Sequence, residues 1–403
     1  MTDAETLAER VKAGDLRLYE LEAHADADTA AAARRQLLAE EVGADLETVG
    51  DYSFPTDRAD PNIENMIGVA QIPMGVAGPL PVDGEAAGGS FYLPLATTEG
   101  ALVASVNRGA DAIRAAGGAN ATVLQRGMTR APVFETSGVR EAAAVADWIR
   151  ASRDRLAAAA EATTSHGELR EATPYVVGDS VFVRFVYDTK DAMGMNMATI
   201  ATREAAEVIE AETPVSLVAV SGNLCTDKKP AGINAIEGRG RSVAADAVVP
   251  ADVIEDRFGT SPDAIAEVNT RKNLIGSAKA ASLGFNAHAA NVVGAAFLAL
   301  GQDVAQVVEG AHAITSVEVR DAGLYVSVTL PALAVGTVGG GTGLPTQSEA
   351  LELLGLAGGG DPPGTNGDAL AAVLAAGALA GELSLLGALA GRHLASAHAE
   401  HGR

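Results

Sequence analysis

The chain has few lysines, cysteines and aromatic residues. Of its 403 residues, six are lysine, one is cysteine and 4% are aromatic. The single Cys225 excludes an intramolecular disulfide and favours a reducing compartment. A formal net charge of −23 argues against nucleic acid or an anionic membrane as a partner, because both are bound through basic patches.

Long apolar runs are also missing. The N-terminus, Met-Thr-Asp-Ala-Glu-Thr, lacks the basic and apolar regions of a signal peptide. The longest helix-like apolar run, residues 369–381, is shorter than the ~20 residues that cross a membrane, so we expect a buried helix. These observations predict a cytoplasmic protein without a membrane partner.

The excess of acid over base suggests a high-salt cytoplasm. The chain has 52 acidic and 29 basic residues, and the acidic ones are spread along its length. Concentrated salt shortens the Debye length to ~3 Å and screens the repulsion between such charges. We therefore expect a halophilic protein.

Three common site motifs are absent. The sequence contains no G-x-G-x-x-G and no G-x-x-x-x-G-K-[ST], so any nucleotide is bound by a different device. The C-terminal histidines have no H-E-x-x-H spacing, so we expect no metal.

The first part of the chain predicts helices over 3–49 and a polar break at 56–61. The glycine- and proline-rich segment 64–80 indicates a strand with tight turns, where backbone approaches a ligand or another chain; an ordinary buried hairpin explains it equally. After a strand at 91–95, Thr97 or Thr98 is expected to cap a helix that runs to about Ala116. Glu99 would then lie in its first turn, where it commonly serves only the helix dipole.

Residues 131–220 predict a self-contained β-α-β-β-α-β unit, the order of a ferredoxin-like domain. The fold class is therefore α+β, with this small domain inserted into a large mixed α/β domain. The predicted division is a helical segment at 1–49, a large domain at 50–130 and 221–403, and the insert at 131–220. Gly194 near the start of the second helix of the insert would let a phosphate or ribose approach free N–H groups.

The later part of the chain predicts a helix over 251–268, a turn around Lys272 and an apolar helix that ends at Leu300. Asp303 is expected to cap the next helix. Two strands over 315–335, a flexible glycine loop and a helix over 369–398 follow.

Two of the six lysines, Lys228 and Lys229, stand side by side between Asp227 and Pro230. An ammonium group suits an oxyanion that appears only in a transition state, and Asp227 would hold one lysine charged. A solvated turn explains the same four residues equally well.

Taken together, these segments resemble the 3-hydroxy-3-methylglutaryl-coenzyme A (HMG-CoA) reductase family. The resemblance spans residue 64 to the end. It rests on ENMIGVAQIPMGVAGPL, LATTEGALVASVNRG, GMTRAPV, DAMGMNM, SGNLCTDKKPAGINAIEGRG, KNLIGS, NAHAANVV, GQD, GTVGGGTGLP and AGELSLLGALAGRHLASAH. The DAMGMNM form is similar to class I, the class of eukaryotes and archaea, and we expect a soluble chain without the membrane anchor that one branch of the family carries. The resemblance implies reduction of HMG-CoA to mevalonate and CoA with two NADPH, in isoprenoid biosynthesis.

The resemblance also implies roles for individual residues. Lys228 would stabilise the oxyanion, Glu99 would donate a proton, Asp303 would lie between them and tune both, and His398 would protonate the CoA thiolate. The substrate-binding residues would be Arg130, Ser221, Asp227, Lys229, Lys272 and Asn291, with Tyr19 over the CoA adenine. The cofactor-binding residues would be Asp191, Met193, Gly194, Met195, Asn196, Gly339 and Gly340. Residues of 64–80 would complete the site of a neighbouring chain, so we expect a homodimer or a larger assembly.

One departure and two alternatives follow from the same resemblance. The chain has Ser165-His166 where animal members carry a Ser-Arg pair for the 2'-phosphate. An NADH-dependent, mevalonate-degrading reductase of the same fold is one alternative. A non-catalytic CoA- or nucleotide-binding homologue is the other, although Glu99, Lys228, Asp303 and His398 are all present.

Overall fold

One ten-stranded sheet runs through the computed structural model, which describes residues 2–391. Its central order is β7-β4-β6-β3-β8-β10-β9, while β1 pairs with β2 and β3, and β5 pairs with β6. All pairs are antiparallel except that between β1 and β3. The strands are β1 Met74–Asp83, β2 Gly89–Ala96, β3 Ala119–Arg130, β4 Val133–Glu135, β5 Glu168–Val177, β6 Ser180–Asp188, β7 Ser216–Ala219, β8 Gly240–Val249, β9 Ile314–Arg320 and β10 Gly323–Leu333. The mixed α/β architecture confirms the predicted fold class.

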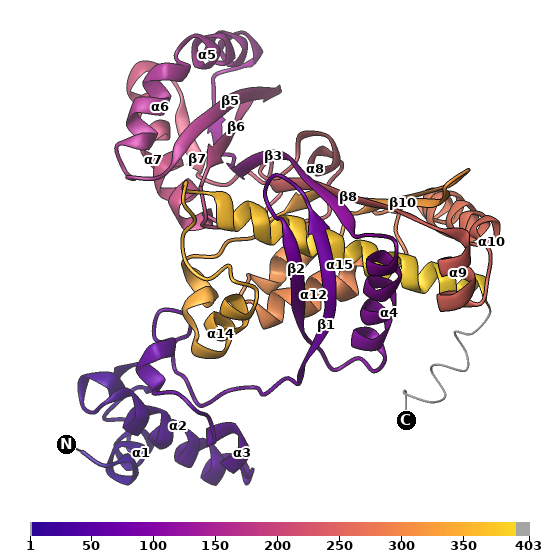
Figure 1. Cartoon of the computed structure of the whole chain (residues 1–403). Helices are drawn as coiled ribbons and strands as arrows, with labels where there is room; N and C mark the ends of the chain where they lie inside the picture. Colours follow the sequence, from indigo (N-terminus) through magenta and orange to yellow (C-terminus); the bar gives the residue numbers. More distant parts are fainter. Residues whose placement is uncertain (1, 392–403) are drawn as a thin grey trace.

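The helices cover this sheet and extend beyond it at both ends (Figure 1). The longer ones are α1 Ala4–Lys12, α2 Ala27–Val42, α4 Leu102–Ala115, α5 Val139–Ala151, α6 Arg153–Glu161, α7 Met195–Glu212, α9 Ala251–Phe258, α10 Pro262–Val268, α12 Ala289–Ala299, α14 Pro345–Leu353 and α15 Thr365–Ala390. The shorter ones are η1 Leu18–Ala23, α3 Glu47–Gly50, η2 Thr56–Ala59, α8 Gly232–Glu237, η3 Asn269–Gly276, α11 Ser277–Lys279, η4 Val304–Gln306, α13 Val307–Gly310 and η5 Gly340–Gly343.

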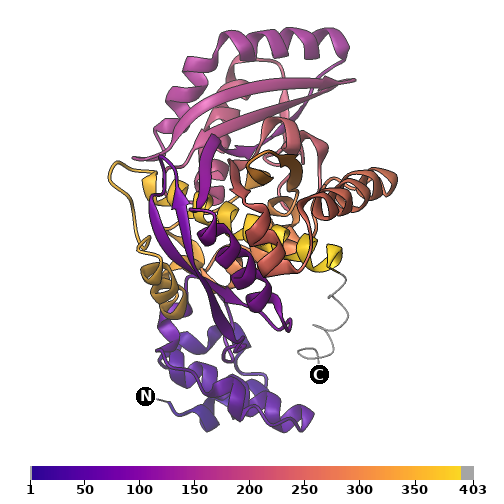
Figure 2. The ribbon, with the colours of Figure 1, turned by 45° about the vertical axis from the view of Figure 1, so that its right-hand side comes forward.

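Buried apolar side chains gather in three places. The largest cluster surrounds α15, a second lies among α5, α6, α7, β5 and β6, and a small one joins α1 to α2. Figure 2 shows the N-terminal helices and the α5–α7 unit at opposite ends of the molecule, with the α15 unit between them. The element order from β4 to β7 is β-α-α-β-β-α-β, because Ser152 separates α5 from α6. The boundaries of the three predicted domains remain a prediction.

The helix α15 is the centre of the large cluster. It packs against α4, α12, β8 and β10, and it is buried almost all round. Within the described residues it is the one helix apolar and long enough to cross a membrane, yet 94% of its most apolar window is buried inside the chain. Gly109 lets α4 approach closely, because a Cβ there would lie 1.9 Å from the carbonyl oxygen of Ala380. The described helix ends at Ala390, and the part of the predicted helix over 392–398 lies outside the described residues.

Several predicted boundaries were wrong for identifiable local reasons. The helix expected at Thr97 begins only at Leu102, because Ala101 takes a left-handed conformation (φ 68°), so Glu99 lies in the preceding loop. The helix expected over 251–268 is two helices: Gly259 ends α9 with φ 62°, and Ser261 caps α10. Lys272 lies in the π-helix η3, not in a turn.

Two central strands were not predicted. β3 and β8 pair along most of their length, and β3 then continues to pair with β6, which joins the two halves of the sheet. The residues of β8 alternate between buried and partly exposed, but four of the ten are alanine or glycine, whose strand preference is weak. Its position is set by pairing with β3 and β10 rather than by its own composition.

Candidate active site

The loop between β7 and α8 carries most of the predicted polar residues, and its backbone is unusual. Asn223, Thr226 and Lys228 all have positive φ (65°, 57° and 57°), a region that non-glycine residues seldom occupy. Contacts to neighbouring elements hold this shape. The Thr129 hydroxyl donates to the carbonyl oxygen of Cys225 at 2.9 Å, and the Gly222 N–H donates to the carbonyl oxygen of Ala131 at 2.6 Å. The fold therefore stabilises a strained loop, a common property of functional sites.

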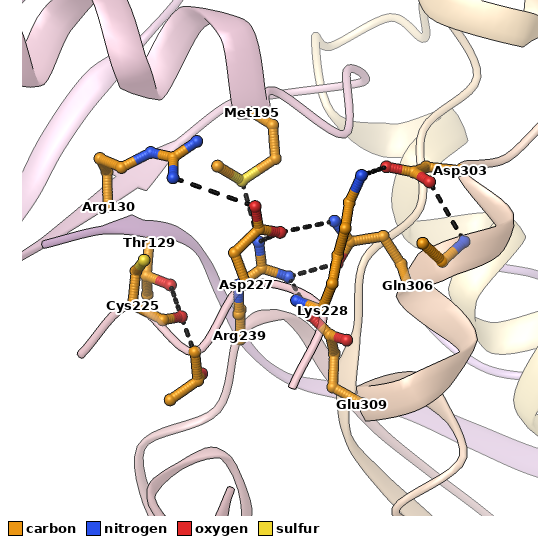
Figure 3. A network of polar contacts seen from close by, with 12 residues as sticks. Thr129, Arg130, Met195, Cys225, Asp227, Lys228, Arg239, Asp303, Gln306 and Glu309 are labelled. Carbon is orange, nitrogen blue, oxygen red and sulfur yellow. Dashed lines mark hydrogen bonds and ion pairs between the residues drawn. The ribbon is translucent and has the colours of Figure 1, made fainter. Parts of the chain in front are cut away.

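Lys228 projects from this loop toward Asp303 (Figure 3). Its Nζ lies 2.8 Å from Oδ2 of Asp303, while Oδ1 of the same carboxylate accepts the N–H of Ala305 and caps η4, as predicted. The hydrogen bond from Asp303 raises the pKa of Lys228 above its ordinary value. The side chain of Lys228 is 43% exposed. An ammonium group whose charged form Asp303 favours therefore faces an accessible space.

Three further predicted substrate-binding residues lie in or next to this loop. Arg130 donates from Nε and Nη2 to the hydroxyl of Thr199 at 3.0 and 2.8 Å, and its Nη1 lies 3.9 Å from Oδ2 of Asp227. Lys229 donates to the carbonyl oxygen of Asp227 at 3.0 Å. The hydroxyl of Ser221 lies 3.5 Å from the sulfur of Cys225. Two cationic side chains, Arg130 and Lys229, thus lie near Asp227, an arrangement suited to an anionic substrate.

A pocket of about 770 Å³ opens next to Lys228 and Asp303. Its lining includes Asp227 of the same loop and predicted residues from three further segments, namely Arg130, Met193, Gly194, Met195, Asn196, Gly339 and Gly340. Gly194 precedes α7 with φ 85° and provides no side-chain cap, so the first N–H groups of this 18-residue helix are open to an anion. Gly339 and Gly340 have nothing within 4 Å of the position where a Cβ would stand.

Asp191 has a different position from the one implied by the cofactor role. It is buried and does not line the pocket. Its carboxylate accepts the N–H groups of Gly360, Gly364 and Gly367 at 3.0, 2.7 and 2.9 Å. Asp191 therefore fixes the chain at the start of α15 and leaves the lining of the pocket to the residues that follow it.

A second cluster contains Glu99 and Asn291. The amide of Asn291 donates to Oε1 of Glu99 at 3.2 Å and lies 3.4 Å from Nδ1 of His288. Nε2 of His288 is 2.7 Å from the carbonyl oxygen of Gly381, and Lys272 donates to the carbonyl oxygen of Ala287 at 3.2 Å. The sequence motif contained His288, but we had not assigned it a role.

The helix α12 separates the two clusters within one chain. Asn291 lies in its first turn, and Asp303 follows its C-terminal end. From Asn291 to Ala299 the helix rises by eight residue steps, or about 12 Å at 1.5 Å per residue. Among residues 2–391 no hydrogen bond or ion pair connects Glu99 to Lys228 or Asp303. The expectation that Asp303 lies between Glu99 and Lys228 is thus wrong for residues of the same chain.

The remaining predicted residues lie apart from both clusters. Tyr19 is on η1 and 62% exposed, and it lines neither of the two principal pockets. His398 lies outside the described residues. A smaller hollow of about 310 Å³ on α4 is lined by Asn107, Arg108, Arg114 and neighbouring residues. In the described part of the chain no group of three or more histidine, cysteine, aspartate or glutamate side chains is arranged to hold a metal ion.

Comparison with known proteins first identifies the class: the chain is an oxidoreductase. It belongs to the hydroxymethylglutaryl-coenzyme A reductase family, whose model matches residues 30–403. The chain is 67% identical over 403 residues to the 3-hydroxy-3-methylglutaryl-coenzyme A reductase of Haloferax volcanii, with 100% of both chains covered. It is 52% identical over 407 residues to that of Pyrococcus abyssi, again with 100% of both covered.

A solved structure shows the same fold at lower identity. The class II enzyme of Streptococcus pneumoniae, described as bound to NADPH in open conformations, has a TM-score of 0.68 and 21% identity. The match covers 88% of this chain and 86% of that one. At this identity the likeness concerns the fold alone.

Proposed function

We propose that this protein reduces (S)-HMG-CoA to (R)-mevalonate and CoA with NADPH, as a soluble, cytoplasmic class I enzyme of isoprenoid biosynthesis. The observation that carries the proposal is the Lys228–Asp303 pair, which lines the same pocket as the N-terminus of α7. The 67% identity to curated reductases of Haloferax volcanii and Halobacterium salinarum supports the reaction and a halophilic source.

The residues of the pocket fit a dinucleotide with phosphate groups. The open N–H groups at the start of α7 suit a phosphate, and the glycines of 339–340 leave room for one to approach the backbone. Met193, Gly194, Met195 and Asn196 would bind NADPH together with Gly339 and Gly340. When bound, two molecules in turn supply two hydrides to the thioester carbon.

Lys228 would stabilise the negative charge that develops on the thioester oxygen as the first hydride arrives. The C–S bond then breaks, CoA leaves as its thiol after protonation by His398, and the aldehyde receives the second hydride and a proton from Glu99. In sum, HMG-CoA, two NADPH and two protons give mevalonate, CoA and two NADP⁺. Arg130, Ser221, Asp227, Lys229, Lys272 and Asn291 would bind the hydroxymethylglutaryl group, with Tyr19 near the adenine of CoA.

This mechanism requires Glu99 beside Lys228, so we propose that each site combines residues of two chains. The separation by α12 supports this, since a second copy can bring its Glu99 cluster to the Lys228 cluster. The exposed apolar side chains of the β1–β2 region are suited to the contact between chains: Ile72, Met74, Val76 and Tyr92 are 38–52% exposed.

The experiment that tests the reaction follows NADPH absorbance with HMG-CoA in concentrated KCl. We expect two NADPH to be oxidised per mevalonate formed, and Lys228→Ala to lower kcat at least about 100-fold, as loss of an oxyanion-stabilising group does. Preferential turnover of NADH would favour the mevalonate-degrading alternative. A folded protein without turnover of either cofactor would favour a non-catalytic homologue.

A further inference from the structure

The backbone of Lys228 is held by a residue far away in sequence. Lys228 has φ 57°, and its N–H donates to Oε1 of Glu309 at 3.0 Å. A non-glycine residue in this conformation is strained, and the conformation persists only where neighbours enforce it. Glu309 lies on α13, a few residues after Asp303, and its side chain is fully buried. One short segment, 303–309, therefore contacts both ends of Lys228: the ammonium group and the backbone N–H.

Arg239 connects the same carboxylate to the residue before Lys228. Its Nη1 lies 2.6 Å from Oε1 of Glu309 and its Nη2 lies 2.9 Å from Oδ1 of Asp227 (Figure 3). Gln306 completes the network, because it accepts from Arg239 and donates to the same Asp227 oxygen at 2.9 Å. Glu309 thus holds the backbone of Lys228. Arg239, just before β8, and Gln306 hold the carboxylate of Asp227.

Stability alone does not account for this arrangement. A buried ion pair is often no more stabilising than well-packed apolar residues of similar volume, because both charges lose water. Burial raises the pKa of Glu309, and Arg239 opposes that shift. Oε2 of Glu309 and Nε of Arg239 are buried without a hydrogen-bond partner in the described structure. An incompletely satisfied charged pair beneath the proposed catalytic lysine indicates a role in geometry.

We propose that Glu309, held by Arg239, is a positioning residue that sets the backbone of Lys228 so that its ammonium group meets the oxyanion. This proposal rests on the role proposed above for Lys228. Glu309 itself does not touch the substrate. The backbone N–H of Lys228 needs an acceptor at this place, and no nearby main-chain carbonyl takes that role among the described contacts.

Two double variants that differ in one respect separate positioning from stability. Arg239→Met with Glu309→Met removes both buried charges and the acceptor for the Lys228 N–H. Arg239→Met with Glu309→Gln removes both charges but keeps an acceptor oxygen. Full-length proteins are assayed with HMG-CoA and NADPH in concentrated KCl, and their unfolding temperatures are measured under the same conditions.

We expect the Met/Met variant to lose about 100-fold in kcat with KM for HMG-CoA changed less than about threefold, as displacement of a reacting group by ~1 Å does. The Met/Gln variant should recover about tenfold in kcat, although its unfolding temperature is no higher. Asp368→Asn is the control, because it disrupts the similarly buried Arg241–Asp368 pair. It should lower the unfolding temperature and leave kcat within about twofold.

Equal kcat values for the two double variants would overturn the proposal. So would a kcat that falls in proportion to the unfolding temperature in all variants, the control included. If the Met/Met variant does not fold, the Met/Gln variant decides: it supports the proposal with kcat lowered about tenfold at unchanged KM, and overturns it with kcat equal to wild type. Wild-type protein that does not turn over HMG-CoA would refute the proposed function instead, so the two failures are distinguishable.

Discussion

Asp303 holds Lys228 by one oxygen and the start of η4 by the other. Oδ2 lies 2.8 Å from Nζ of Lys228, and Oδ1 accepts the N–H of Ala305 at 3.2 Å. The carboxylate is therefore fixed in direction by the helix that it caps, and the ammonium group is fixed by the carboxylate. A residue with an ordinary structural role as a helix cap thus also orients the group proposed to stabilise the oxyanion.

Asp303→Asn should shift the alkaline limb of the kcat–pH profile to lower pH. The carboxylate raises the pKa of Lys228, so its removal lets the ammonium group lose its proton at lower pH. The stabilisation from the pair is present below the unfolded pKa of ~10.4 and is lost as pH rises through the higher folded pKa. We also expect kcat near neutral pH to fall about tenfold.

Asp154→Asn is the matched control for this experiment. Asp154 pairs with Arg153 on the surface and its side chain is 97% exposed, so the whole profile should stay unchanged. An unshifted alkaline limb in Asp303→Asn would mean that another group controls the charge on Lys228, the proposed catalytic lysine.

Gly194→Ala should weaken NADPH binding and stability together. Alanine at φ 85° is strained, and its Cβ would lie 2.3 Å from Cγ2 of Thr189, so the start of α7 must move. Gly178 has a similar φ of 63°, but no atom lies within 4 Å of the place where its Cβ would stand. Gly178→Ala therefore measures the cost of the backbone conformation without a steric clash. We expect both variants to lose roughly 1 kcal/mol or more of unfolding free energy, and only Gly194→Ala to raise KM for NADPH. An unchanged KM for NADPH in both variants would show that the start of α7 does not bind the cofactor.

Added KCl should raise the unfolding temperature steeply at first and then less. The formal net charge is −23, and screening of its self-repulsion is nearly complete once the Debye length has fallen to ~3 Å near 1 M salt. Thermal scans from dilute buffer to several molar KCl would measure this. An unfolding temperature independent of KCl would contradict the charge argument.

The sequence was most informative where local chemistry decides the structure. The cap at Asp303 and the helices α1 and α2 depend on residues close in the chain, and the structure has them. The predicted β-α-β-β-α-β order differs from the structure only in its first helix, which Ser152 divides into α5 and α6. It was least informative where distant segments decide. β8 forms because β3 and β10 flank it, and nothing in its alanine-rich sequence required that.

The same distinction applies to the site. Lys228 and Asp227 stood out because lysine is scarce and the motif is dense in polar residues. Glu309 and Gln306 had no such signal, because their importance comes from a contact across about 80 residues of chain. The burial of Asp191 against Gly360, Gly364 and Gly367 depends on the path of a loop more than 160 residues away, which a local motif does not reveal.

The measurement that tests the account most directly is the activity of defined heterodimers, with two differently tagged chains co-expressed and purified through both tags. One chain carries Glu99→Gln and the other Lys228→Ala, each inactive as a homodimer. If each site combines the Glu99 cluster of one chain with the Lys228 cluster of the other, one of the two sites is intact and kcat per dimer is about half of wild type.

The reciprocal heterodimer carries both substitutions in one chain and none in the other. A shared site then leaves both sites defective, and this heterodimer should be inactive. The opposite pattern, with an inactive first heterodimer and half activity in the second, would show that Glu99 and Lys228 act within one chain and would contradict the account.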